Sequence, residues 1–138
     1  MRKELEEAVI NVGLVKDVHK FKYSGAGVSN NQYYKSSHWT QRNKLVNEYH
    51  EIILDFIGDK LDGKDLDKFG LLLFYNSRHD TDNIVGFGKI FVDVLNKELN
   101  VIKEDNKHHY KVCMTAPDLD LPHNTFEFLL IEYENETE

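Results

Sequence analysis

The chain has 138 residues, 41% hydrophobic and 30% charged, which is enough to bury one core and too few for two domains of ordinary size. Its mean hydropathy of −0.54 and its lack of any long apolar run exclude a membrane-spanning segment, and its single cysteine excludes an internal disulfide. We therefore expect one soluble domain with no membrane partner, in a reducing cytoplasm.

The net charge of −7 is distributed unevenly along the chain. From Asp118 to the C-terminus there are seven acidic residues and no Lys or Arg, and we interpret residues 134–138 as a solvated acidic tail. The segment from Lys16 to Lys44, by contrast, holds six Lys or Arg against Asp17 alone. A basic segment of this kind favours contact with phosphates, although the whole chain is acidic.

Hydrophobic periodicity predicts four strands and two principal helices, after an N-terminal extension (1–17) with a shorter helix and no assigned function. The strands are expected at 18–23, 69–76, 107–115 and 125–133, and the principal helices at 39–57 and 84–99. The last two strands are expected to pair as a hairpin, with Cys113 buried. The pattern predicts a single α+β domain over 1–138, with a mixed sheet of about four strands carrying two principal helices.

Asp80 and Asp82 stand between a predicted buried strand and a predicted helix. Where both are extended, their side chains point to the same side, because side chains alternate along a strand. Two carboxylates so close repel each other unless a cation lies between them, and a hard divalent ion such as Mg²⁺ takes oxygen ligands. Alternatively, Asp82 is the N-cap of the helix, worth about 1 kcal/mol, and Asp80 lies in the turn.

A second acidic pair, Glu104 and Asp105, follows the predicted end of that helix. The order of strand, Asp-x-Asp, helix, acidic pair and strand allows a third carboxylate to return to the first two. Three converging carboxylates favour a metal site over a helix cap.

Four short motifs resemble, in the same order, those of the RusA-type Holliday-junction resolvases, a family of small phage-associated, magnesium-dependent endonucleases. The motifs are Ser29–Tyr34, His79–Asn83, Lys89 with Asp93, and Ile102–Asp105, and the similarity covers roughly residues 21–133. The resemblance implies a homodimer that resolves four-way DNA junctions by paired, symmetric phosphodiester hydrolysis. It also implies the cytoplasm of a bacterium or of a phage-infected cell.

By this resemblance, Asp80, Asp82 and Asp105 bind Mg²⁺, or Mn²⁺ in its place, and act in catalysis. The family has a lysine four residues after the second aspartate, where this chain has Gly86. Lys89 lies one turn further along nearly the same helix face and is our candidate for the catalytic cation. Alternatively, Lys89 pairs with Asp93 at i, i+4.

The first motif and the basic segment around it supply candidates for DNA contact. Asn, Tyr, Lys and Arg side chains suit phosphate contacts and packing against sugars or bases. The candidates are Asn30, Asn31, Tyr33, Tyr34, Lys35, Arg42 and Lys44. A plain turn with two half-buried tyrosines is the alternative for the motif itself.

Two other functions stay open on the sequence. One is a non-catalytic module that binds DNA junctions or a protein, with Gly86 marking lost chemistry. The other is a nuclease for a different branched DNA.

Overall fold

The computed structural model describes residues 2–25, 39–104 and 106–134, and it describes only the main chain of Ile10, residues 39–42, Leu45, Asp82 and Asn83. The elements, in chain order, are α1 (Arg2–Ile10), β1 (Val15–Ser24), α3 (Trp39–Ile57), β2 (Lys68–Asn76), α4 (Thr81–Lys97), β3 (Tyr110–Pro117) and β4 (Thr125–Tyr133). The predicted α+β class with a mixed four-stranded sheet is confirmed. In the described part of the chain, no helix combines the length and the apolar character needed to cross a bilayer.

The strand order in the sheet is β1-β4-β2-β3, so the predicted hairpin of the last two strands is wrong. β4 lies between β1 and β2 and is antiparallel to both, whereas β3 pairs with β2 in parallel. The reason is burial: nearly every residue of β4 is buried, and a strand covered on both faces occupies the centre of a sheet. The connection between β3 and β4 therefore crosses the end of β2, where Asn76 donates a hydrogen bond to the Leu121 carbonyl at 2.7 Å.

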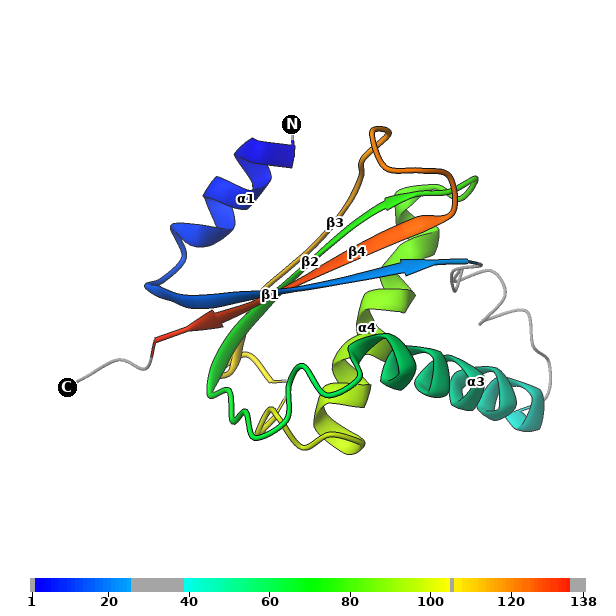
Figure 1. Ribbon diagram of the computed structural model, residues 1–138, viewed down its shortest axis with the longest axis horizontal. Helices are drawn as coiled ribbons and strands as arrows, with labels where there is room; N and C mark the ends of the chain where they lie inside the picture. The colour runs from blue at the N-terminus through cyan, green and yellow to red at the C-terminus, as the bar shows by residue number, and fades with distance from the viewer. Residues whose placement is uncertain (1, 26–38, 105, 135–138) are drawn as a thin grey trace.

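Helices α3 and α4 cover one face of the sheet, and the shorter α1 lies against the other (Figure 1). Phe87 of α4 packs against Phe126 and Phe128 of β4 at ring-centroid distances of 5.1 and 5.0 Å. Because β3 is parallel to β2, α4 has to run back along the sheet between them. Its first turn thus lies where β2 ends, and its last turn lies where β2 begins (Figure 1).

Cys113 is exposed, and the expectation of a buried thiol is wrong. β3 is an edge strand, and its side chains alternate between the core and solvent where those of β2 are nearly all buried. The apolar neighbours of Cys113 in the sequence indicate a strand, but they do not distinguish an edge from a centre.

Helix α1 is attached to the sheet by Arg2. The guanidinium donates to Glu6 at 3.0 Å, to Asp118 at 2.8 Å and to Glu127, and it lies 4.4 Å from the centre of the Phe74 ring. Burial opposes the charge of Arg2, but the hydrogen bonds to these carboxylates outweigh burial and raise its pKa. The N-terminal helix is therefore a packed part of the domain.

Replacing Arg2 with alanine is expected to lower the free energy of unfolding by roughly 1.5–3 kcal/mol at neutral pH, as for hydrogen bonds between charged groups. The hydrogen bond from Arg2 lowers the pKa of Asp118. The stabilisation is therefore complete above the unfolded-state pKa, about 4, and is lost as pH falls through the lower folded-state pKa. Urea denaturation should show the difference between wild type and variant shrinking below about pH 4, with exposed Lys3→Ala as a neutral control. A difference independent of pH would contradict this account.

Candidate functional site

Asp80 is the N-cap residue of α4, at the point where the chain leaves β2. Its backbone is extended, with φ −73° and ψ 159°, and its side chain makes no capping hydrogen bond. An N-cap aspartate ordinarily accepts a hydrogen bond from an N–H group of the first turn. The exposed Asp80 carboxylate thus keeps its oxygens available for another ligand, next to a helix end that carries partial positive charge.

Asp82 lies inside α4, at its second residue. The alternative that Asp82 is the N-cap is therefore wrong, because Asp80 holds that position. The condition that both aspartates be extended is not met, because Asp82 is helical, so strand alternation does not align them. The intervening Thr81 fixes this end of α4 to the sheet, since its hydroxyl lies 2.8 Å from the hydroxyl of buried Tyr75 on β2.

The residues flanking the third aspartate lie at the opposite end of the sheet. Asp105 itself is outside the described residues. Before it, Ile102 forms a bridge with Leu66 just ahead of β2, and after it, the His109 carbonyl accepts a hydrogen bond from Phe69, near the start of β2, at 2.9 Å. The 17 residues of α4, at about 1.5 Å each, put about 25 Å between this region and Asp80. One chain therefore does not bring these two regions together.

Lys89 is exposed and lies on the side of α4 that faces the edge strand. It lines a groove of about 270 Å³ together with Val85, Val92, Tyr110 and Cys113. Its Cα lies nine residues from that of Asp80, about 13 Å along the helix axis. The structure thus places Lys89 in the groove between α4 and β3, more than two turns away from the start of the helix.

The alternative interpretation of Lys89, an ion pair with Asp93, is wrong for the described chain. Among the side chains that the structure describes, Lys89 forms no salt bridge with Asp93, although the two are four residues apart on one helix. The Lys89 ammonium and the Asp93 carboxylate are therefore both available to other partners.

Five of the seven candidate DNA-contacting residues belong to the first motif or directly follow it. Asn30, Asn31, Tyr33, Tyr34 and Lys35 lie outside the described residues. The two others belong to the N-terminal half of α3, where the Lys44 side chain is exposed and only the main chain of Arg42 is described.

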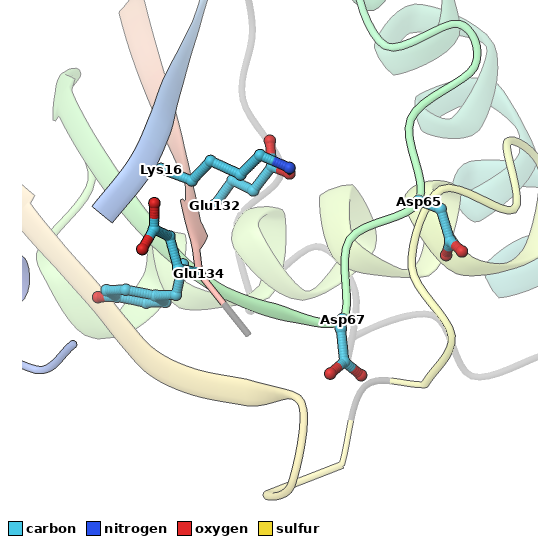
Figure 2. A pocket seen from close by; sticks show the side chains of 6 residues that line it. Lys16, Asp65, Asp67, Glu132 and Glu134 are labelled. Carbon is cyan, nitrogen blue, oxygen red and sulfur yellow. The ribbon is translucent and has the colours of Figure 1, made fainter. Parts of the chain in front are cut away.

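A second pocket, of about 260 Å³, lies beside the start of β2 and the end of β4, and sequence reasoning missed it. Glu132 on β4 is buried. Its Oε2 lies 3.6 Å from Lys16 Nζ, and its Oε1 lies 3.2 Å from His19 Nε2. Figure 2 shows Lys16 reaching this carboxylate, whereas Asp65 and Asp67 point away from it. The buried carboxylate of Glu132 therefore has its partners, Lys16 and His19, within the chain. The available signal was the ionisable Glu132 inside an apolar strand, which needs a partner on the neighbouring strand.

Over residues 2–25, 39–104 and 106–134, no three carboxylate, histidine or cysteine side chains are grouped as for a metal ion. The Asp82 side chain and Asp105 lie outside this described part, so the ligand set of Asp80, Asp82 and Asp105 stays a prediction. No protein-family model matches the chain, and no curated protein matches it significantly.

Proposed function

We propose that this protein is a metal-dependent endonuclease that resolves four-way DNA junctions as a homodimer. The observation that carries the proposal is the Asp80 carboxylate, exposed and without a capping bond at the start of α4, two residues before Asp82. The order of four motifs along the chain, which resembles the RusA-type resolvases, supplies the reaction and the substrate.

The chain's own residues fit a hard divalent cation. Asp80 supplies carboxylate oxygens at a rigid junction of strand and helix, and Asp82 brings a second carboxylate within the same turn. A bound Mg²⁺ or Mn²⁺ supplies an activated water and offsets charge on the phosphate oxygens. Asp80 and Asp82 would hold and orient that ion, and the positive end of α4 would favour a phosphate beside it.

A site with all three aspartates needs two chains. Glu104 and Asn106 flank Asp105 about 25 Å from Asp80, so the third carboxylate would come from a second copy. Two copies related by a two-fold axis give two identical sites, each completed by the other chain. This arrangement fits a four-way junction, which is itself two-fold symmetric and requires two symmetric cuts.

Cleavage of an immobile, labelled four-way junction tests this proposal. With Mg²⁺ or Mn²⁺, we expect paired symmetric nicks in the junction and none in a linear duplex of the same sequence. Asp82→Asn is expected to abolish the nicks, whereas Asp55→Asn, at an exposed carboxylate on α3, should retain them. Cleavage that persists in Asp82→Asn, or equal cleavage of duplex and junction, would overturn the proposal.

The second candidate is a non-catalytic module that binds branched DNA. It is favoured by the absence of a family lysine at Gly86 and by the position of Lys89, about 13 Å along the helix from Asp80. Junction binding by electrophoretic mobility shift, without nicks in either metal, would support this candidate.

A further inference from the structure

The two edges of the sheet differ in how well they are protected. The edge strand β1 has a bulge between Val15 and Asp17 and carries exposed Lys20 and Lys22, features that discourage pairing with another strand. The edge strand β3 pairs with β2 on one side and with no described strand on the other. Beyond the exposed Lys111, its stretch from Val112 to Ala116 contains no charged residue.

An apolar groove runs beside this edge. Its lining comes from α4 on one side and β3 on the other, through Val85, Lys89, Val92, Tyr110 and Cys113. Val85 is 45% exposed, which makes it one of the few large hydrophobic residues that the described structure leaves in solvent. The unpaired edge offers main-chain hydrogen bonds, and the groove beside it offers apolar surface to the same partner.

The charge of Lys89, which lines the groove, and the charge of Asp93 on the same helix are self-complementary. Lys89 and the partly exposed Asp93 lie one turn apart on α4 and do not pair within the described chain. If two copies of α4 lie antiparallel with an axis level with Phe91, Lys89 faces the partner's Asp93, and the reverse pair forms by symmetry. A β edge is likewise complementary to itself when two strands pair antiparallel.

We propose that a second copy of this chain docks along this surface, with β3 pairing antiparallel to the partner's β3 and the two α4 helices side by side. This two-fold arrangement brings the start of one α4 to the end of the sheet where the other chain carries Glu104 and Asn106. It would thereby join the two parts of the candidate metal site. Only this consequence rests on the proposed function, because the strand edge, the groove and the charges are independent of it.

Cross-linking through the single cysteine tests the strand pairing. An axis between Val112 and Met114 places the two Cys113 side chains directly opposite or diagonal, about 5–8 Å apart. A short bismaleimide should therefore convert the dilute protein to a covalent dimer. The matched control is Cys113→Ser with Lys20→Cys, which moves the thiol to the other sheet edge, and it should stay monomeric on the denaturing gel. Absent cross-linking at Cys113, or equal cross-linking of the control, would overturn the proposal.

A charge exchange tests the helix pairing. Lys89→Asp and Asp93→Lys should each raise the dimer dissociation constant, measured by sedimentation velocity, at least about tenfold. The double variant exchanges the two charges and should return the constant to within about threefold of wild type. A double variant that associates no better than the single ones would overturn the pairing.

Both experiments use the full chain without metal or DNA, so the two proposals fail separately. A dimer cross-linked at Cys113 that cuts no junction rejects the nuclease and keeps the interface. An active nuclease whose Cys113 is not cross-linked rejects the interface alone.

Discussion

Phe128→Ala is expected to lower the free energy of unfolding by about 3–5 kcal/mol, the range for removing a fully buried phenylalanine. Phe128 lies on the central strand with no exposed surface. Its ring packs against Phe56 of α3 at 5.5 Å and against Phe87 and Phe91 of α4 at 5.0 and 4.6 Å. The alanine would leave a cavity where two helices meet the sheet, and urea denaturation followed by circular dichroism measures the loss.

Phe128→Leu serves as the matched control, since it keeps most of the apolar volume and should cost less than the alanine variant. The larger loss has a functional consequence, because Phe87 and Phe91 hold the helix whose first turn carries Asp80 and Asp82. If the alanine variant lost less than about 1.5 kcal/mol, the ring cluster would not be the main anchor of α4.

The positions of the helices and strands could be predicted well from local patterns. The apolar period from Trp39 to Ile57 coincides with α3, and the predicted strand 69–76 differs from β2 by one residue. Boundaries were less certain where turns compete: β3 starts at Tyr110, three residues later than expected, because Asn106 accepts hydrogen bonds from His109 and Tyr110 in a turn.

The order of the strands could not be predicted from adjacency in the sequence. A short connection between the last two strands favours a hairpin, but Leu129 and Ile131 need burial on the face opposite to Phe128. That face is covered by α1 and includes Leu72 of β2. The central position of β4 therefore depends on contacts from both ends of the chain, which no local pattern contains.

The sequence predicted the two aspartates at the start of a helix, but it did not predict where the segment around the third aspartate lies relative to them. The Asp80 and Asp82 positions at a strand-helix junction follow from the sequence, whereas their backbone conformations do not. The order of the elements was expected to allow a third carboxylate to return to the first two. In a strand-helix-strand unit, however, residues that follow the first strand and residues that precede the parallel second strand lie at opposite ends of the sheet.

Two inactive variants are expected to restore cleavage when they share a dimer. Asp82→Asn and Asp105→Asn should each reduce junction cleavage by more than about 100-fold, since even residues that only support a metal ligand cost up to that factor. In a mixed dimer, one site carries both substitutions and the other carries neither. Random exchange of chains should therefore recover about a quarter of the wild-type nicking, because half of the dimers are mixed and half of their sites are intact.

A mixture of Asp82→Asn with Asp80→Asn is the matched control, because both substitutions fall on the part of the site that one chain contributes. Each site of that mixed dimer keeps one substitution, so cleavage should stay absent. In the mixture of Asp82→Asn with Asp105→Asn, each mixed dimer has one intact site, so it should nick one strand at a time. If neither mixture cuts after exchange of chains has been verified with distinct tags, the three aspartates do not form a site shared between two chains. The 25 Å that α4 places between its two ends would then require a metal site built without Asp105.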